Sequence, residues 1–500
     1  MKTRIASGLW VFLTVAVLLG AACSNPFGSG SSGSTSGGSN TAEQDFPPPI
    51  EFAVFATTGL PDITLHWAEP NSSVNAYRVF RSESSGDYDF SAPIAEISSA
   101  GPEYSYVDTT AAMDTLYYYV VEALAGGSVA DTSEEVSATA RAVSAVADLD
   151  FVYVDPSAPD GGNGSSGEPF NSIAAGVAGV NAGGTVLLFN GVYQLITSVG
   201  IEKQVVIRSA TGSYLFSEAI INAGEIGNTA AVEFLGGSDG SILQGVRITG
   251  AVRTSSSKGT IQVGSNSGNA PNDVKVLHNH LYANQGVGIS NYMDSGESHR
   301  TVIAGNWITD HSGGGSVRHA VRIRDGLLGG RFEYNIIENV EDSGAGINID
   351  NASGFTIAGN HFKNIGGHGI NLGGGTNNFT VSDNLLEHTN TGERADGGGI
   401  RMYGASHTTS VVIAGNTIVN SFNNIYQRDD DISASDITIE NNTIVAPAPG
   451  SWLIYNAATT GILVTRGNWF GSADEDDFRD DIGGAEEDNV DYSDWLTSAP

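Results

Sequence analysis

The chain has 500 residues, with 22 Lys or Arg against 56 Asp or Glu, and a formal net charge of −34. Its length suffices for two or three domains, and so acidic a surface repels phosphate backbones, which argues against nucleic acid as a partner. Because Cys23 is the only cysteine, no intramolecular disulfide can form, and stability must come from packing and backbone pairing.

The first residues have the pattern of a secretory signal. Lys2 and Arg4 precede the apolar run LWVFLTVAVLLGAA, which is too short for a lasting membrane span. LLGAAC resembles the bacterial lipobox, whose cysteine is lipidated and becomes the mature N-terminus, although Gly20 replaces the usual leucine. We predict a signal peptide over residues 1–22, lipidation of Cys23 and anchoring at the bacterial cell surface or outer membrane. An ordinary signal peptide with an incidental cysteine is the alternative.

The next segments predict a tether and a first folded domain. Residues 23–46 are rich in Gly and Ser and predict a flexible chain. Residues 47–143 carry short alternating segments, and the order LHWAEP, AYRVFRS, YSYVDTT, TLYYYVVEAL, EVSATA resembles a fibronectin type III domain. The resemblance implies a β-sandwich with Trp67 in the core and one tyrosine of 117–119 at a corner. We expect a spacer or weak adhesion unit.

The phrase apolar-x-apolar-x-x-Asn-x-apolar, as in FTIAGNHF, recurs through the second half of the chain. Its asparagine is Asn279, Asn306, Asn335, Asn360, Asn384, Asn416 and Asn442, with Asn468 interpreted as one residue out of step. A period in the mid-twenties with β-type patterning predicts a solenoid. Each coil should supply three short parallel strands, stacked roughly 4.8 Å apart. We interpret the asparagine as structural, adopting the left-handed conformation at a tight turn and hydrogen bonding along the stack.

This repeat resembles a right-handed parallel β-helix of the pectate-lyase-like kind over residues 150–470. The predicted fold class is therefore all-β, a right-handed single-stranded parallel β-helix preceded by a fibronectin type III-like β-sandwich. GEPFNSIAAGVAGVNAGGTVLLFNGVY resembles the opening segment of such domains, which implies a short helix over residues 172–182 before a first strand at 185–189.

Residues 471–500 form an acidic C-terminal segment in this interpretation. GNWFGS, just before it, resembles the terminal coil of bacterial surface β-helix proteins. Asp474, Asp476 and Asp480 could supply oxygen ligands to a Ca²⁺ ion, the one cofactor that we consider. A solvated insertion is the alternative.

Side chains at equal offsets in successive coils should form vertical columns. After each Gly-Ile pair the inward positions are Ile289, Val321, Ile347, Ile370, Ile400 and Ile425. One step on, the outward residues are Ser290, Arg322, Asn348, Asn371, Arg401 and Tyr426; two further on they are Tyr292, Arg324, Asp350, Gly373, Tyr403 and Arg428. Arginine forks bind carboxylates and tyrosine faces take sugar rings. We predict substrate binding by Arg322, Arg324, Asn348, Asp350, Asn371, Tyr403, Tyr426 and Arg428.

Two catalytic routes fit these residue types. An eliminating lyase needs a base and a cation, and a glycosidase needs two carboxylates. The order RIRDG, VEDSGAGINI, GGHGINLGG, GGIRMYG resembles that of polygalacturonase-type hydrolases, which implies Asp325 and Asp342 as carboxylates, His368 as their neighbour and Arg401 as a carboxylate clamp. Their Arg-Ile-Lys motif is Arg-Met-Tyr here. The lysines open to a lyase base, Lys203, Lys258, Lys275 and Lys363, lie in no recognisable lyase motif.

We therefore expect an exported, monomeric protein that contacts the membrane only through its lipid anchor. It would bind or process extracellular polysaccharide containing uronic acids, as a lyase or as a polygalacturonase-like hydrolase. The alternative is a non-catalytic surface or adhesion protein whose polar columns are only scaffold, with Arg–Asp pairs satisfying one another.

Overall fold

The computed structural model describes residues 52–57, 60–68, 74–98, 103–252, 259–264, 271–292, 298–312, 319–324, 327–341, 344–403, 409–428, 437–445, 450–457, 462–484 and 490–499. The predicted signal peptide, Cys23 and the tether lie outside these residues, as do Asp325, Asp342 and Lys258. None of the helices within the described ranges has the length and apolar character needed to cross a membrane.

Two antiparallel sheets form the N-terminal part of the described chain. One has the order β1 (Val54–Thr57), β2 (Ile63–Ala68), β5 (Glu103–Asp108); the other has the order β4 (Ala95–Ser98), β3 (Ala76–Ser82), β6 (Leu116–Ala125), β7 (Ser128–Thr132), with β8 (Val136–Thr139) also on β6. Alternating residues of both sheets share one core. Trp67 lies fully buried in it, with its ring 5.4 Å from that of Tyr77, as predicted for a core residue.

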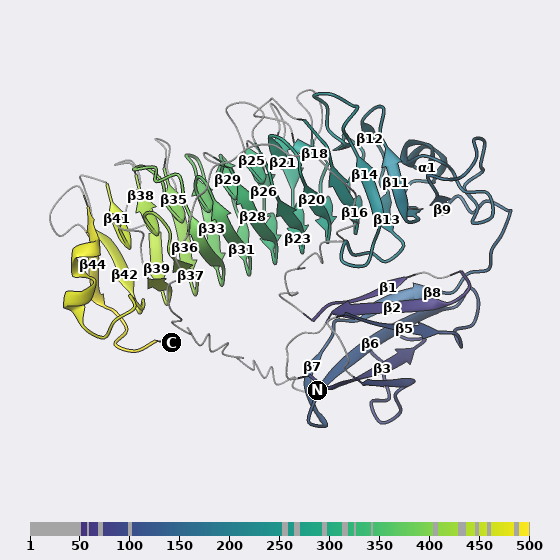
Figure 1. Cartoon of the computed structure of the whole chain (residues 1–500), viewed down its shortest axis with the longest axis horizontal. Helices are drawn as coiled ribbons and strands as arrows, with labels where there is room; N and C mark the ends of the chain where they lie inside the picture. Colours follow the sequence, from purple (N-terminus) through teal and green to yellow (C-terminus); the bar gives the residue numbers. More distant parts are fainter. Residues whose placement is uncertain are drawn as a thin grey trace, which may run out of the picture. The chain divides into compact units, whose positions relative to one another are not determined.

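The rest of the described chain winds into coils whose strands stack in three parallel sheets (Figure 1). The first sheet contains β9 (Phe151–Val154), β10 (Thr185–Leu188), β13 (Val206–Ser209), β16 (Ile242–Gln244), β19 (Lys275–Leu277), β23 (Val302–Ala304), β27 (Arg331–Glu333), β30 (Thr356–Ala358), β33 (Asn377–Ser382), β36 (Thr409–Ala414), β39 (Ile437–Glu440), β42 (Leu463–Arg466) and β44 (Val490–Asp494). The second contains β11 (Gly191–Gln194), β14 (Ala219–Asn222), β17 (Arg247–Thr249), β20 (His280–Tyr282), β24 (Trp307–Thr309), β28 (Ile336–Val340), β31 (His361–Ile365), β34 (Leu385–Thr389), β37 (Thr417–Val419) and β40 (Thr443–Val445).

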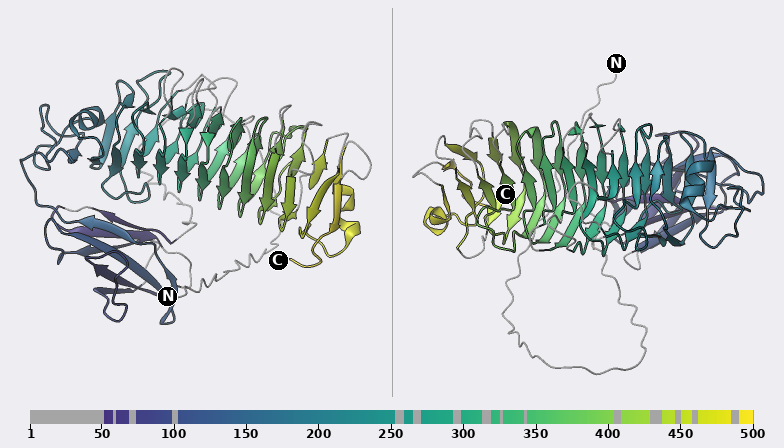
Figure 2. Two further views of the ribbon diagram at one scale, coloured as in Figure 1. Left: turned by 180° about the vertical axis from the view of Figure 1, so that it is seen from behind. Right: turned by 90° about the horizontal axis from the view of Figure 1, so that it is seen from above.

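The third sheet contains β12 (Val199–Ile201), β15 (Val232–Phe234), β18 (Gly259–Val263), β21 (Val287–Tyr292), β25 (Val321–Arg324), β29 (Ile347–Asp350), β32 (Ile370–Leu372), β35 (Ile400–Met402), β38 (Ile425–Gln427), β41 (Ile454–Asn456) and β43 (Ile482–Gly484). A short pair, β22 (Ser298–His299) and β26 (Leu327–Leu328), stands beside them. The second view in Figure 2 shows the strands of successive coils lying side by side. The fold is a parallel β-helix, as predicted.

One continuous apolar core fills the coils. The six inward positions predicted on the third sheet, Ile289, Val321, Ile347, Ile370, Ile400 and Ile425, are all fully buried. Burying a side chain of this size contributes on the order of 2 kcal/mol. β-branched residues suit these strands because they pack well on a pleated, buried surface.

The repeated asparagines form a hydrogen-bonded ladder between the first and second sheets. From Asn306 through to Asn468, each accepts at Oδ1 from the backbone N–H of the preceding ladder asparagine, at 2.9–3.0 Å. Their side-chain Nδ2 groups donate along the same line at 2.9–3.1 Å. All eight side chains are buried. The structural interpretation is therefore confirmed.

Two details of the ladder correct the sequence interpretation. The left-handed residue is the one before each asparagine, for example His278 (φ 52°) and Gly305 (φ 64°), and the asparagines themselves are not in that conformation. Asn468 is in step with the ladder, because Asn442 donates to it at 2.9 Å. The exception in that coil is Thr465, a buried residue paired with Ile439 where other coils have an apolar residue.

The two ends of the β-helix differ from prediction in extent. At the start, α1 (Ile173–Gly179) is shorter than expected, and its N-cap Ser172 accepts from the N–H of Ala175. A Cβ on Gly176 would lie 2.6 Å from Val154 Cγ2, so the helix packs directly on β9, a strand that precedes the predicted first one. At the far end, η2 (Glu475–Asp477), η3 (Arg479–Asp481), β43 and β44 continue the coils to Asp494, beyond the predicted limit of residue 470.

Candidate functional site

An outward column runs along the third sheet as the repeat predicts. Register joins Ser290 to Arg322 and continues through Asn348, Asn371, Arg401 and Tyr426 to Tyr455. We call these seven residues the polar column. The neighbouring predicted column is also in register where β25 and β29 pair Arg324 with Asp350. The backbone N–H groups of Tyr403 and Arg428 each donate to the preceding coil, which places them at the following rungs.

Most of the polar column lies beneath the surface. Arg322 is 9% exposed and Arg401 is 4% exposed, and Ser290, Asn348 and Asn371 are also buried. Tyr426 and Tyr455, at its C-terminal end, are partly exposed. The column therefore has two parts. Residues Ser290 to Arg401 form a buried polar stretch, and Tyr426 and Tyr455 form an accessible aromatic end.

The buried stretch is held by a continuous chain of hydrogen bonds. Arg401 Nη1 donates to Asn371 Oδ1 at 3.1 Å, and Asn371 Nδ2 donates to Asn348 Oδ1 at 2.5 Å. Asn348 Nδ2 then donates to Asp350 Oδ2 at 2.9 Å, while the Tyr403 hydroxyl donates to the other oxygen at 2.7 Å. Polar groups buried in this way rigidify a site when their partners are satisfied.

Gly373 makes part of this hydrogen-bond network possible. Tyr403 and Asp350 belong to coils on either side of the coil that carries Gly373. A Cβ on Gly373 would lie 2.1 Å from Asp350 Oδ1, so any other residue would displace the carboxylate that Tyr403 contacts. Burial, followed by the nearby Asp350 charge, raises the pKa of the Tyr403 hydroxyl to about 12.

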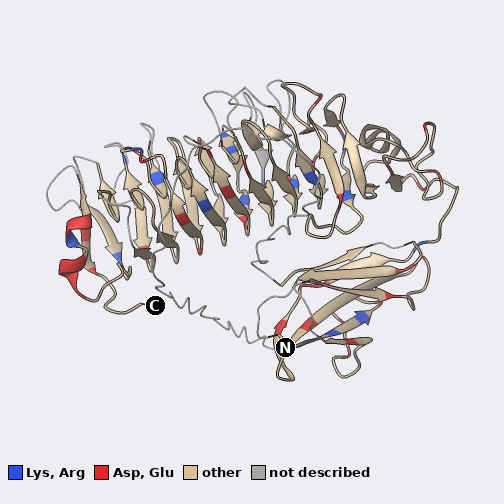
Figure 3. Ribbon diagram, viewed as in Figure 1, with Lys and Arg blue, Asp and Glu red and all other residues tan. Residues whose placement is uncertain are grey.

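Three arginines surround one carboxylate next to the accessible end. Arg401 Nη2 lies 3.1 Å from Asp396 Oδ2, Arg394 Nη2 lies 3.4 Å from Oδ1, and Arg428 Nη1 lies 3.8 Å from Oδ2. Burial alone would raise the pKa of Asp396, but the three guanidinium groups lower it below its usual range. Three guanidinium groups therefore gather around this one carboxylate, on a chain whose net charge is −34. Figure 3 shows basic and acidic residues together around β35 and β38.

Aromatic rings continue from this charge cluster along the third sheet. The rings of Tyr426 and Tyr455 stack with centroids 5.3 Å apart and planes 10° from parallel. Trp452 lies against Tyr455 at 5.1 Å and is itself partly exposed. Arg401 Cζ lies 4.2 Å from the centre of the Tyr403 ring, within the range of a cation–π contact. Tyr403 and Tyr426 thus border the arginine cluster, and Tyr455 and Trp452 extend the aromatic surface from Tyr426.

Two histidines occupy the turn that leads into the third sheet. His319 Nδ1 accepts from the N–H of Ala345 at 3.0 Å, and His368 Nδ1 accepts from the N–H of Gly398 at 3.4 Å. Burial, then the charge of Arg322, lowers the pKa of His319 to about 3; burial, then the charge of Arg401, does the same for His368. Both rings are therefore neutral near pH 7 and are weak bases.

The predicted catalytic residues are only partly placed. His368 and Arg401 lie on the same side of the coils and interact electrostatically, while Asp325 and Asp342 fall outside the described residues. Lys203 donates to the carbonyls of Ala178 and Val180 at the end of α1, so its ammonium group is used to cap that helix. Lys275 and Lys363 stand on exposed positions of β19 and β31, in the first and second sheets.

The three aspartates proposed for calcium are not gathered into a site. Asp474 Oδ1 accepts from the N–H of Asp476 and caps η2, and Asp476 forms an ion pair with Arg479 at 2.7 Å. Within the described ranges, no group of three or more His, Cys, Asp or Glu side chains is arranged to hold a metal ion. Figure 3 shows these acidic residues on the short helices near the C-terminus.

Sequence reasoning missed part of the accessible end. The spacing of LIYNA after NIYQR places Tyr455 one coil after Tyr426, so the signal was present. Trp452 occupies the same turn position as His319 and His368, two residues before the inward apolar residue of its coil. Arg394 comes from the turn over residues 391–398, where no repeat predicts how the chain runs.

Comparison with known proteins bears on the fold. Residues 329–475 match a family model described as a right handed beta helix region, which confirms the predicted handedness for these coils. Solved structures similar to this chain include the Azotobacter vinelandii mannuronan C-5 epimerase AlgE6 A-module, with 15% identity, TM-score 0.37, and 57% of this chain and 76% of that chain covered. Pectate lyase Pel9A has 15% identity and TM-score 0.39, with coverages of 64% and 76%.

A third similar structure is XylC in complex with xylose, with 13% identity, TM-score 0.42 and coverages of 60% and 69%. Structures this distant carry no argument about function. No curated protein matches the chain in sequence.

Proposed function

We propose that the protein binds extracellular polysaccharide containing uronic acids at the C-terminal end of the polar column. The observation that carries this proposal is the junction of the three-arginine cluster around Asp396 with the stacked rings of Tyr426 and Tyr455. A uronic acid presents a carboxylate and a ring with an apolar face. At the junction, the arginines can bind the carboxylate and the tyrosine rings can contact the apolar face of the sugar.

Electrostatics favour an anionic polymer at this place. The chain as a whole repels anions because of its net charge of −34. Against that background, three of the few basic side chains gather around Asp396, and the side chains of Arg394 and Arg428 are each 43% exposed. Arginine matches a carboxylate through a planar fork of donors.

The buried stretch of the column serves as support in this proposal. Asn348, Asn371 and Arg401 are too covered to contact a polymer, but they fix the positions of Asp396 and Tyr403 through hydrogen bonds. A rigid supporting layer lowers the ordering cost of binding. Contact with the polymer then falls to Arg394, Arg428, Tyr426, Tyr455 and Trp452.

Binding, without turnover, is the function that this end supports best. His368 is buried, neutral and already accepts a backbone hydrogen bond at Nδ1, so it lacks the properties of a general base poised near neutral pH. A lyase or hydrolase acting through Asp325 and Asp342 is the second candidate, resting on the motif order alone.

Affinity electrophoresis of residues 47–500 in gels containing polygalacturonate, alginate or a glycosaminoglycan tests the proposal. We expect retardation in at least one acidic gel, none in a neutral glucan gel, and loss of retardation in the double variant Arg394→Gln/Arg428→Gln. The matched control is Arg300→Gln/Arg466→Gln, which removes the same charge from exposed positions elsewhere. Equal retardation of the two double variants would contradict the proposal.

Absorbance at 235 nm and reducing-end assays, with and without Ca²⁺, test the enzymatic candidate in the same samples. An increase in absorbance would identify elimination, and new reducing ends without it would identify hydrolysis. We expect neither signal. Turnover that is lost in Asp325→Asn or Asp342→Asn would replace binding alone with catalysis as the function.

For the N-terminal part, we propose a fibronectin type III-like domain. The sheet orders β1-β2-β5 and β4-β3-β6-β7 support it. The N–H of Ala112 donates to the Tyr117 hydroxyl at 3.3 Å, which resembles the tyrosine corner of such sandwiches. Removing this hydroxyl with Tyr117→Phe should lower the melting temperature of the sandwich, whereas an unchanged value would argue against a corner role.

We also propose export and lipid anchoring through Cys23, on the lipobox resemblance of residues 18–23. Expression in a bacterial host with labelled palmitate should label the wild type in the membrane fraction. Cys23→Ser should lose both the label and the membrane association. A membrane-associated, unlabelled wild type would contradict lipidation.

A further inference from the structure

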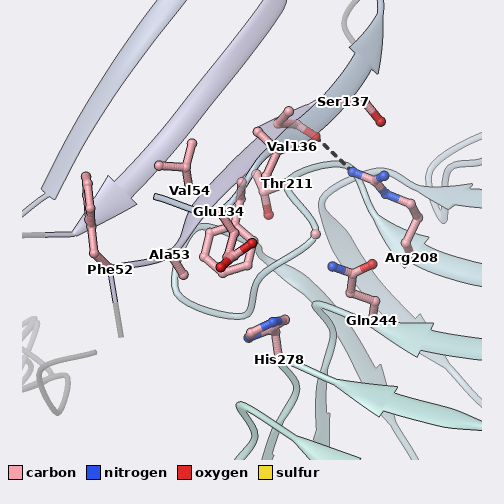
Figure 4. A pocket seen from close by; sticks show the side chains of 13 residues that line it. Phe52, Ala53, Val54, Glu134, Val136, Ser137, Arg208, Thr211, Gln244 and His278 are labelled. Atoms are coloured by element: carbon pink, nitrogen blue, oxygen red, sulfur yellow. Dashed lines mark hydrogen bonds between the residues drawn. The ribbon is translucent and has the colours of Figure 1, made fainter. Parts of the chain in front are cut away.

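A cleft lies where strand β1 faces the first sheet of the β-helix (Figure 4). Its volume is about 320 Å³, at the lower end of the range typical of small-molecule sites. The β-helix contributes Arg208, Gln244 and His278, and the N-terminal sheets contribute Phe52, Glu134 and Val136. The cleft is separate from the polar column, which belongs to the third sheet.

Specific contacts hold the walls of this cleft together. Arg208 Nη2 donates to the carbonyl oxygen of Ala56 at 2.9 Å. The Phe55 ring lies 5.0 Å from His278 in an edge-to-face arrangement and 6.1 Å from Phe216. His66 stacks on the same Phe216 at 5.3 Å. These contacts give the cleft a defined shape.

Two hydrogen-bond donors converge inside the cleft without an acidic partner. Arg208 and Gln244 are paired rungs on β13 and β16. A Cβ on Gly212 would lie 3.3 Å from Arg208 Nη2 and 3.4 Å from Gln244 Nε2, so both groups border the same small space. Among the described residues, Arg208 donates only to backbone carbonyls and forms no ion pair, and the Gln244 side chain has no hydrogen-bond partner.

The chain has 56 acidic residues against 22 basic ones, yet this guanidinium group has no carboxylate partner among the described residues. Glu134 lines the same cleft but does not form an ion pair with Arg208. His278 adds a ring that burial keeps neutral, since its pKa is lowered to about 4. The inner wall thus carries one positive charge, one amide and one neutral ring, with aromatic and aliphatic surface opposite.

We infer that this cleft binds a small molecule that bears a carboxylate on a body of about monosaccharide size, with Arg208 and Gln244 holding the carboxylate beside Gly212. The apolar surface of Phe52, Phe55 and Val136 would contact the body of the ligand. Because Glu134 is negatively charged and faces the same space, it limits the affinity for an anion. This inference stands independently of the proposed polysaccharide site.

Isothermal titration of residues 47–500 with galacturonate, and with galactose at the same concentrations, tests the inference. We expect galacturonate to bind at one site and galactose not to bind. Arg208→Gln should weaken binding about tenfold or more, because a charge-assisted hydrogen bond is lost. Glu134→Gln should strengthen binding by about twofold or more, because a like charge is removed.

Two further variants separate a loss of binding in the cleft from a loss of structure and from binding at the polar column. Since Arg208→Gln also removes the contact with Ala56, Gln244→Ala tests the second donor without touching that contact, and it should weaken binding severalfold. Tyr426→Ala/Tyr455→Ala should leave galacturonate binding unchanged, which separates this cleft from the polar column. Absence of galacturonate binding would overturn the inference, as would binding that survives Arg208→Gln and Gln244→Ala or is lost in the tyrosine variant.

Discussion

The asparagine ladder and the polar column are both vertical rows of polar side chains in the same coils, yet they differ in composition and exposure. Every rung of the ladder carries the same residue, is buried and bonds to its neighbours in the same way. The polar column changes residue from rung to rung, and its end with Tyr426 and Tyr455 is accessible. Uniform, buried repetition marks a structural row, whereas variation that ends at the surface marks a candidate site.

The largest effect should come from breaking the ladder in its middle. Asn360→Ala removes the acceptor of two Asn335 donors and leaves the carbonyl of Phe332 without its partner. Unsatisfied buried groups of this kind should lower the free energy of unfolding by about 3 kcal/mol. Chemical denaturation measures this change, with Asn181→Ala as a control that removes one exposed hydrogen bond to Asp150. Equal midpoints for the two variants would contradict the structural role.

Breaking the buried stretch of the polar column should cost somewhat less stability and also weaken polymer binding. Arg401→Met removes the donor to the Asn371 amide oxygen and one of the donors to the Asp396 carboxylate. We expect a loss of about 2 kcal/mol, discounted because Asp396 is partly exposed. Denaturation and affinity electrophoresis on the same sample measure both effects. Arg401→Lys should not restore binding, since an ammonium lacks the planar fork; full rescue by lysine would argue for a simple charge effect.

An effect that is small at pH 7 and grows only in acid should come from His368. Its pKa is about 3 in the folded protein and 6.5 in its ordinary state, so the unfolded chain takes up a proton first as the pH falls. The folded state therefore loses stability between about pH 6.5 and pH 3. His368→Gln removes this loss, which is about 2 kcal/mol at pH 5 because that pH lies 1.5 units below 6.5 and each unit corresponds to about 1.4 kcal/mol.

Melting temperatures of the wild type and His368→Gln at pH 7 and pH 5 measure this difference. The variant should lose fewer degrees on acidification, and its polymer binding at pH 7 should stay within about twofold. Parallel pH dependences would show that His368 is not buried as a neutral ring. Strongly reduced binding at pH 7 would give it a direct role in the site.

The comparison also explains what the sequence could predict. Equal spacing of the asparagines and alternation of the apolar residues identify the coils and their register, because stacked coils place equal offsets on one face. The left-handed position was readable as well, since glycine precedes the asparagine at Gly305, Gly359, Gly415 and Gly467. The prediction placed that conformation at the asparagine, one residue too late.

Burial of the outward arginines could not be read from the repeat. The alternation of apolar and polar residues predicts whether a side chain on a strand points inward or outward. Whether another segment covers an outward side chain depends on turns such as residues 391–398, whose sequence does not repeat. Asp396 comes from this turn and pairs with Arg401. The cleft beside Arg208 could not be predicted for a related reason, since it is formed by segments 152 residues apart in the chain.

The most direct test of the proposed site is the affinity for polygalacturonate oligomers of the wild type and of Tyr426→Ala/Tyr455→Ala, measured with melting temperatures on the same samples. Because these rings are partly exposed, we expect little change in melting temperature and at least about tenfold weaker binding, as stacking contacts of this kind are lost. Unchanged affinity in a folded double variant would show that the accessible end of the polar column does not bind the polymer.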